Sequence, residues 1–380
     1  MTVSLSDDQL RRLRLRAQRL ASRQPAPAAD VAAVAKELCG LQAQDPLAAA
    51  LAIRARSSGL VARDVERARV DERSVIRTWC LRGTLHLLAA EDLGWLLPLL
   101  GPVFVRKSGR RYAELGLDEG TRAKATHVLG QLLSRHSSLA RAEIVHHLAA
   151  RGIALAGQAV PHLLRYAALQ GVICHGPERE GEPTYVLLSE WVDYHPTVGR
   201  AAALAELARR YLGAYAPAGP PDLAAWSGLP LAEVRPGWQR IADQLLQVQC
   251  RSQPAWLLNS QSAWLDALTE QPPLVRLLPS FDTYLLGYRT RDLLVASEYG
   301  KRLHPGGGVL HPTLLVNGRA AGTWRVRRQR DHLAVTVEPF EDLADDAQPG
   351  LEAEVRDLGR FLGVEARCSV VAPTHAEASH

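Results

Sequence analysis

Residues 121–188 carry the pattern that most restricts the fold of this chain. Three helical stretches are followed by two short strand-like stretches, which flank a charged, glycine-containing tip at residues 176–183. The elements are expected as helices at 121–134, 140–150 and 157–170 and as strands at 172–175 and 184–188. Three helices and a two-stranded wing are the elements of a winged helix-turn-helix, so the segment predicts one.

The same order of elements recurs on both sides of that segment. Before it, Ser6 with Asp7 and Asp8 predicts an N-capped first helix. The expected elements there are helices at 6–20, 29–41, 46–56 and 61–68 and strands at 74–80 and 83–88. After it they are helices at 200–215, from an Asp222 cap onward and at 230–246, with strands at 245–250 and 255–259. The chain therefore predicts three tandem copies of the motif.

From residue 273 onward the pattern changes to strands. They are expected at 275–278, 313–316, 319–327, 333–339 and 367–371, with a helix at 350–362. Asn317-Gly318 is a hairpin-turn signature. The predicted fold class is α+β, with tandem winged helix-turn-helix motifs followed by a small C-terminal β-barrel-like module. The predicted units span residues 1–118, 119–196, 197–270 and 271–372, with a flexible tail at 373–380.

Composition indicates a globular chain of the reducing cytoplasm. The 380 residues are 47% hydrophobic and 22% charged. No apolar run reaches the ~18 residues of a membrane span, and the basic stretch at 11–23 lacks the apolar core of a signal peptide. Five cysteines lie far apart without a CxxC pair, which argues against a zinc site and a disulfide framework. We therefore expect a cytoplasmic protein with no membrane association and no metal.

The basic charge has two explanations. The net charge is +5, and only four of the 45 basic residues are lysines, at positions 36, 107, 124 and 301. A GC-rich genome favours arginine over lysine and explains the ratio without function. Guanidinium groups also match phosphate oxygens, so a nucleic-acid partner stays open.

Common catalytic motifs are absent. The chain has no Walker loop, dinucleotide fingerprint, HExxH or GxSxG, which argues against ATPase, dehydrogenase, zinc-protease and hydrolase chemistry and predicts no cofactor. His146-His147 is expected on an exposed helix face. Asp282 is expected as a cap or a salt-bridge partner.

Four segments form a set of motifs that span most of the chain. They are Leu41-Gln-Ala-Gln-Asp-Pro46, Arg77-Thr-Trp-Cys-Leu-Arg-Gly-Thr-Leu-His86, Leu278-Pro-Ser-Phe-Asp-Thr-Tyr-Leu-Leu-Gly-Tyr288 and Val316-Asn-Gly-Arg-Ala-Ala-Gly-Thr-Trp324. In this order they resemble the AlkZ-like winged-helix DNA glycosylases. The resemblance implies three tandem winged helices and a C-terminal β-barrel, in agreement with the pattern above.

The resemblance also implies an activity and its residues. Members are bacterial monofunctional glycosylases that remove N-alkylated (N7 or N3) purines and unhook interstrand crosslinks from double-stranded DNA. The pair Gln42 and Gln44 is similar to the Gln-apolar-Gln branch, which is linked to self-resistance against alkylating natural products, and it would position the attacking water. Asp45 leaves open whether a carboxylate also reaches the site. We expect a monomer without a cofactor.

Three further residues of the first predicted hairpin are expected to bind DNA: Arg77, Arg82 and His86. Gly83 would permit a tight turn between the two strands, so that Arg82 projects from its tip toward phosphate or the minor groove. The structural alternative for Arg82 is a salt bridge to Glu72 or Glu91.

The chemistry is consistent with two neutral glutamines. Alkylation at N7 gives the purine a positive charge, so the base can leave without a general acid, and the protein has only to place a water near C1′. A different class of function remains: a non-catalytic winged-helix DNA-binding protein or transcriptional regulator. The Gln-Ala-Gln motif and the C-terminal module favour the enzyme, because a simple regulator needs neither.

Overall fold

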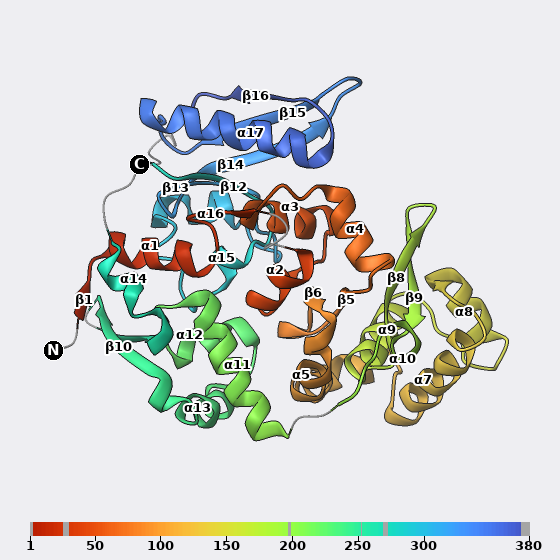
Figure 1. The fold of residues 1–380 in the computed structure, drawn as a ribbon. Coiled ribbons are helices and arrows are strands. Elements are labelled where there is room, and N and C mark those ends of the chain that lie inside the picture. Colours follow the sequence, from red (N-terminus) through yellow and green to blue (C-terminus); the bar gives the residue numbers. More distant parts are fainter. Residues whose placement is uncertain (1–2, 26–29, 197–198, 252, 269–272, 374–380) are drawn as a thin grey trace, which may run out of the picture.

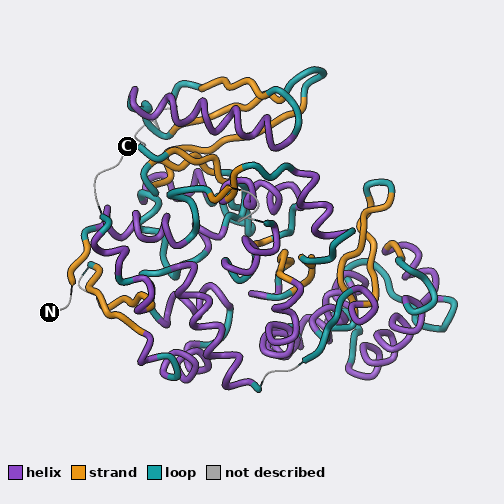
Figure 2. The backbone as a smooth tube through the Cα atoms, in the orientation of Figure 1, coloured by secondary structure: helices purple, strands orange, loops and turns teal. Residues whose placement is uncertain are grey.

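The computed structural model describes residues 3–25, 30–196, 199–251, 253–268 and 273–373, so residues 374–380 of the predicted tail lie outside the described part. It confirms the predicted α+β class: small separate sheets lie among the helices (Figures 1 and 2). The elements are considered in four groups, called the first unit (residues 31–89), the second unit (119–187), the third unit (200–258) and the C-terminal unit (273–370).

The first unit places a short strand between its first two helices. Its elements are α2 (Val31–Glu37), β3 (Leu41–Gln42), α3 (Pro46–Arg56), α4 (Ala62–Val70), β5 (Val75–Trp79) and β6 (Leu85–Ala89). They form a sheet in the order β3-β6-β5. The preceding helix α1 (Asp7–Ala17) begins at Ser6 with a capping box to Gln9, which confirms the predicted N-cap. Two further short strands, β2 (Gln24–Pro25) and β4 (Ser57–Ser58), pair in parallel.

The second unit repeats this order. Its elements are α7 (Glu119–Leu133), β7 (Leu139–Ala140), α8 (Arg141–Ala149), α9 (Ala159–Leu169), β8 (Ile173–Arg179) and β9 (Glu182–Leu187), with the sheet order β7-β9-β8. The predicted loop at 176–183 is wrong, because a bulge between His175 and Glu178 lets the strands pair again beyond it. The tip is only Glu180-Gly181, and both residues have positive φ.

The third unit recruits its third strand from the N-terminus. Its elements are α11 (Arg200–Tyr215), α12 (Pro220–Ser227), α13 (Leu231–Gln239), β10 (Leu245–Cys250) and β11 (Gln253–Leu258). β1 (Val3–Leu5) pairs in parallel with β10. The predicted Asp222 cap is shifted: Gly219 is the N-cap of α12, and the Asp222 carboxylate accepts a hydrogen bond from the Gly219 N–H.

Helices α5 and α6 connect the first two units. α5 (Leu93–Lys107) contains Pro98 and Pro102, and α6 (Gly109–Glu114) follows it. α5 packs against α9 of the second unit and α11 of the third. Most of its apolar side chains are buried. The free energy gained from this burial outweighs the cost of two prolines inside a helix.

The C-terminal unit is an open sheet. Its strands are β12 (Val275–Leu278), β13 (Thr313–Val316), β14 (Arg319–Arg328), β15 (Leu333–Pro339) and β16 (Ala366–Val370), hydrogen-bonded in that order. The expected barrel-like closure is wrong. Helix α17 (Gln348–Leu362) packs against both edge strands, β12 and β16 (Figure 1), so a helix covers the apolar face and the sheet need not close on itself. The Asn317-Gly318 hairpin turn is confirmed, with both residues at positive φ.

Four short helices complete the described chain: α10 (Leu188–Trp191), α14 (Ala263–Asp266), α15 (Thr283–Leu286) and α16 (Gly300–Leu303). One large apolar core joins the first, third and C-terminal units and reaches Leu169, Cys174 and Val186 of the second unit, whose other buried residues form a second core. Within the ranges described, no helix combines the length and apolarity that a membrane span requires.

Candidate active site

Gln42 and Gln44 lie on the short segment between α2 and α3. A glycine at position 40, with φ of +104°, turns the chain out of α2 and into β3. A Cβ on Gly40 would lie 2.6 Å from Cδ2 of Leu88, so a larger residue would strain this turn. β3 then pairs with β6, and this pairing sets Gln42 opposite His86. The glutamine pair is therefore held by a sheet on one side and by α3 on the other.

Asp45 is the N-cap of α3. One of its carboxylate oxygens accepts a hydrogen bond of 2.9 Å from the Leu47 N–H, and Pro46 occupies the first helical position. Asp45, the carboxylate that could also reach the site, therefore caps the start of α3. Its side chain is exposed.

The two amides are linked to each other and to Arg82. The Arg82 guanidinium donates a 2.7 Å hydrogen bond to Oε1 of Gln42, and Nε2 of Gln42 donates a 2.5 Å hydrogen bond to Oε1 of Gln44. Gln42 is 8% exposed, whereas Gln44 is exposed to solvent. A carbonyl oxygen has two lone pairs, so each amide oxygen can accept one more hydrogen bond. Two such acceptors side by side can take both hydrogens of one water molecule.

Arg77 holds the backbone beneath this pair. It is 9% exposed, and its guanidinium donates to the carbonyl oxygens of Ala43 (2.9 Å) and Gln44 (3.2 Å). Burial lowers the pKa of Arg77, with the nearby Arg69 charge adding to the effect. The position of Arg77 therefore does not favour the expected contact with DNA, because its guanidinium donates to backbone carbonyl oxygens of the protein.

Arg82 does not project from the hairpin as expected. The turn between β5 and β6 is a short 3-10 turn, Leu81–Gly83, in which both Arg82 and Gly83 have positive φ. The Arg82 side chain folds back toward Gln42, and it also donates a 2.5 Å hydrogen bond to the carbonyl oxygen of Trp226 in α12. The alternative salt bridges to Glu72 and Glu91 do not form, since those carboxylates pair with Arg67 and Lys36.

His86 is a buried packing residue. It is 1% exposed, and its Nδ1 lies 3.0 Å from the Thr84 carbonyl oxygen, so Nδ1 carries the proton. Burial, aided by the Arg82 charge, lowers the pKa of His86 to about 3. The expected contact between His86 and DNA is corrected accordingly, because a neutral, enclosed imidazole offers nothing to phosphate.

This buried histidine predicts acid sensitivity. Since the folded state keeps His86 neutral while the unfolded state protonates it near pH 6.5, stability is full above about pH 6.5 and falls as pH drops toward 3. We expect His86 to account for a loss of about 2 kcal/mol between about pH 6.5 and pH 5. Urea unfolding of the wild type and of His86→Gln at both pH values measures this: the variant should show a shallower loss. Equal losses would mean that His86 titrates normally in the fold.

The third and fourth motifs, residues 278–288 and 316–324, lie in the C-terminal unit, and the third contacts the end of α3. Arg56, at the end of α3, forms two hydrogen bonds of 2.8 and 2.7 Å to the Asp282 carboxylate, and both side chains are fully buried. Asp282 also caps α15, so both expected roles of this residue are confirmed. The two motifs meet where Trp324 Nε1 donates to the Leu278 carbonyl oxygen at 2.7 Å. The C-terminal unit thus fixes the helix that follows the glutamines.

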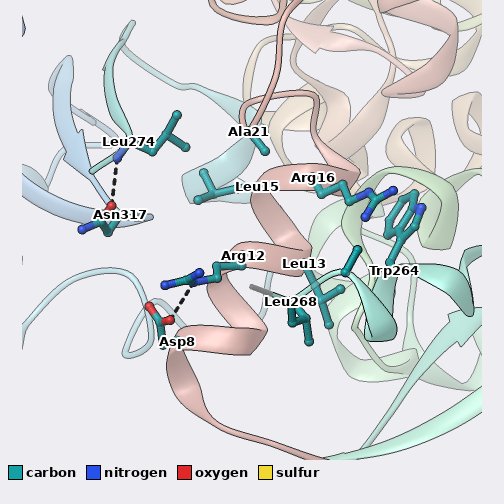
Figure 3. Close-up of a pocket in the computed structure, with 11 residues that line it drawn as sticks. Asp8, Arg12, Leu13, Leu15, Arg16, Ala21, Trp264, Leu268, Leu274 and Asn317 are labelled. Atoms are coloured by element: carbon teal, nitrogen blue, oxygen red, sulfur yellow. Dashed lines mark hydrogen bonds and ion pairs between the residues drawn. The ribbon is translucent and has the colours of Figure 1, made fainter. Parts of the chain in front are cut away.

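Other features lie apart from this site. A small cavity of about 100 Å³ between α1 and α14 is lined by Leu13, Leu15, Trp264 and Leu268 (Figure 3) and includes none of the predicted site residues. His147 stacks on His136, and His146 meets His147 edge to face. Among the residues that the structure describes, no cluster of His, Cys, Asp and Glu could hold a metal ion. The absence of a cofactor stays a prediction.

Three comparisons with known proteins agree with one another. The sequence profile of the family described as DNA glycosylase AlkZ-like matches residues 35–361, which include all four motifs. The chain is 29% identical over 369 residues to an interstrand DNA cross-link repair glycosylase of Streptomyces sahachiroi, covering 92% of this chain and 95% of that protein. The solved structure of the Streptomyces sahachiroi DNA glycosylase AlkZ is similar with a TM-score of 0.80 and 26% identity, covering 97% of this chain and all of that one.

Proposed function

This chain belongs to the AlkZ-like DNA glycosylase family, and on that premise we propose that it hydrolyses the N-glycosidic bond of N7- or N3-alkylated purines in double-stranded DNA. The observation that carries the proposal is the linked pair of Gln42 and Gln44, in which a buried amide donates to an exposed one and each amide oxygen accepts a single hydrogen bond among those described. As a family member the chain is an enzyme, which sets aside the non-catalytic regulator.

The reaction needs little from the protein. A water whose two hydrogens are held by the amide oxygens of Gln42 and Gln44 presents its oxygen lone pairs to C1′ of the damaged nucleotide. The water oxygen bonds to C1′ as the bond from C1′ to the purine nitrogen breaks. The electrons of that bond neutralise the cationic base, and the water releases its proton to solvent. Neutral amides are weak bases, so undamaged purines, which are poor leaving groups, should not react.

We extend the proposal to crosslinks. The relative from Streptomyces sahachiroi is named an interstrand DNA cross-link repair glycosylase, and the match covers nearly all of both chains. A crosslink through two N7-alkylated purines contains the same labile bond on each strand. A duplex with one defined N7–N7 crosslink tests this: release of one strand attachment supports unhooking, and a crosslink that stays intact while N7-methylguanine is removed limits the activity to monoadducts.

We also propose that the three N-terminal units are winged helices that together bind duplex DNA. In the first and second units a short strand precedes two helices and pairs with the last strand of the hairpin, an order typical of winged helices. The outer end of the second unit's hairpin carries three exposed glutamates, Glu178, Glu180 and Glu182, and its one arginine, Arg179, pairs with Glu143. Phosphate contacts should therefore come from other elements.

The arginine content predicts a strong salt effect on binding. Arg327, Arg328 and Arg330 at the β14–β15 tip are exposed and make no ion pair within the described chain. If roughly four to eight arginines contact phosphates, log affinity for duplex DNA should fall linearly with log salt at a slope of about −4 to −7, near 0.9 per contact. Fluorescence anisotropy over a salt series measures this slope. An affinity that does not change with salt would mean that the arginines do not contact phosphates and that their number reflects genome composition.

A further inference from the structure

We propose that Arg82 is a positioning residue that sets the orientation of the Gln42 amide and, through it, that of Gln44. The proposal rests on the proposed function, because it concerns the same two glutamines. It assigns Arg82 to the protein side of the site, acting through Gln42 rather than on the DNA. The hydrogen-bonded series Arg82–Gln42–Gln44 runs from a half-buried guanidinium to an exposed amide.

The orientation follows from the donors and acceptors of the three side chains. A glutamine pair linked by one hydrogen bond has two arrangements, which differ by a flip of both amides, because either one can donate to the other. A guanidinium has donors only. Arg82 therefore requires Oε1 of Gln42 to face it, which turns Nε2 of Gln42 toward Oε1 of Gln44. Removing Arg82 would let both arrangements form and would leave the acceptors for the water undefined.

Arg82 is itself tightly fixed. Its second hydrogen bond goes to the Trp226 carbonyl oxygen, so the guanidinium spans the first and third units. Gly228, just after α12, approaches so closely that a Cβ there would lie 3.0 Å from the Arg82 Cα. Burial lowers the pKa of the guanidinium, yet the group stays charged at neutral pH. A charge-assisted donor with both ends anchored orients an amide better than a mobile surface side chain can.

The competing role for Arg82 is to hold the units together without influence on the chemistry. The chain offers a matched control, since Arg165 of α9 is also half-buried and donates a 2.9 Å hydrogen bond to the carbonyl oxygen of Gly83, the next residue in the same turn. Arg165 supports the turn from the second unit and has no hydrogen bond to either glutamine among those described. Loss of turn support alone should therefore follow from Arg165→Ala.

A double-mutant cycle tests the proposal with the full-length protein. Four proteins are compared: the wild type, Arg82→Ala, Gln42→Ala and the double variant, each with its melting temperature, its affinity for N7-methylguanine duplex and its single-turnover excision rate at saturating enzyme. We expect Arg82→Ala to lower the rate by roughly 10- to 100-fold, the effect of losing one charge-assisted hydrogen bond, with affinity changed less than the rate. In the Gln42→Ala background the same substitution should lower the rate by less than about twofold, because its target is gone.

The outcomes separate this proposal from the proposed function. If Arg82→Ala lowers the rate equally in both backgrounds, or if Arg165→Ala matches it, Arg82 is a structural tie and the positioning role is wrong. If Gln42→Ala itself leaves excision unchanged, the assignment of the glutamines fails first. Where Arg82→Ala proves too unstable to assay, Arg82→Lys keeps the charge but cannot span both acceptors with a planar fork, so an intermediate rate with a near-normal melting temperature supports positioning. Arg82→Met, which keeps much of the side-chain volume but has no donor for Gln42, is the decisive variant: a wild-type rate in Arg82→Met contradicts the positioning role.

Discussion

Replacing Gln44 with alanine should lower the single-turnover rate of N7-methylguanine excision by roughly 100-fold and leave affinity for the duplex within a few-fold. Gln44 carries the exposed amide of the pair, so its oxygen is the acceptor most accessible to an incoming water. The amide is neutral and makes no charge contact with phosphate, which is why binding should persist. Gln42→Ala should have a similar effect, since it removes the second acceptor and the bond that orients Gln44.

Asp45 supplies the control for these variants. Its carboxylate caps α3, and asparagine caps a helix about as well. Asp45→Asn should therefore keep both the fold and the excision rate. A loss of excision in Asp45→Asn with an unchanged melting temperature would show that a carboxylate takes part in the reaction. Wild-type rates in Gln42→Ala and Gln44→Ala would contradict the assignment of the glutamines.

The second large effect concerns stability. Asp282→Ala should lower the free energy of unfolding by about 3–5 kcal/mol, because it leaves the Arg56 guanidinium buried without its counter-charge. Both side chains are 0% exposed, and their two hydrogen bonds join α3 to the C-terminal unit. The remaining partners of Arg56 are the Gln18 side-chain oxygen, the Thr283 hydroxyl and a backbone carbonyl, none of which carries charge.

A surface pair provides the comparison. Arg110 and Glu114 form an ion pair in which the Arg110 side chain is 92% exposed. Glu114→Ala should leave the free energy of unfolding nearly unchanged, because water and salt screen an exposed ion pair. Urea unfolding of Asp282→Ala and Glu114→Ala measures the two changes in stability. Equal, small losses of unfolding free energy would show that the Arg56–Asp282 pair contributes little to the stability of the fold. The double variant Arg56→Met/Asp282→Leu should recover part of the stability lost in Asp282→Ala, because apolar residues of similar volume can fill the same space without leaving a buried charge.

Local pattern predicted most of the fold. The helix at 200–215 and the strands at 275–278, 313–316 and 333–339 were placed at their observed bounds, because each has turn or cap residues at its ends. Long-range pairing was not predictable. The short strands β1, β3 and β7 form only because a distant hairpin offers an edge, and α5 forms despite two prolines because its burial outweighs them. The open sheet likewise depends on where α17 packs.

The sequence predicted candidate site residues but not their geometry. The first two motifs contain Gln42, Gln44, Arg77, Arg82 and His86, and the structure brings these residues together. Spacing alone suggested that Arg82 and His86 face DNA, whereas one turns inward and the other is enclosed. For Arg82 one reason is the Trp226 carbonyl, a backbone acceptor 144 positions away that carries no sequence signal, and for His86 it is the central place of β6 between β3 and β5.

The measurement that tests the central claim most directly is release of a free base from a duplex with a single N7-methylguanine. The wild-type protein, with EDTA present and no added nucleotide, should release N7-methylguanine and leave an abasic site, while an unmodified guanine at the same position stays in place. Gln44→Ala should bind the same duplex and release little. Binding without release by the wild type, or release that requires an added metal ion, would contradict a reaction that depends on a water held by two amides.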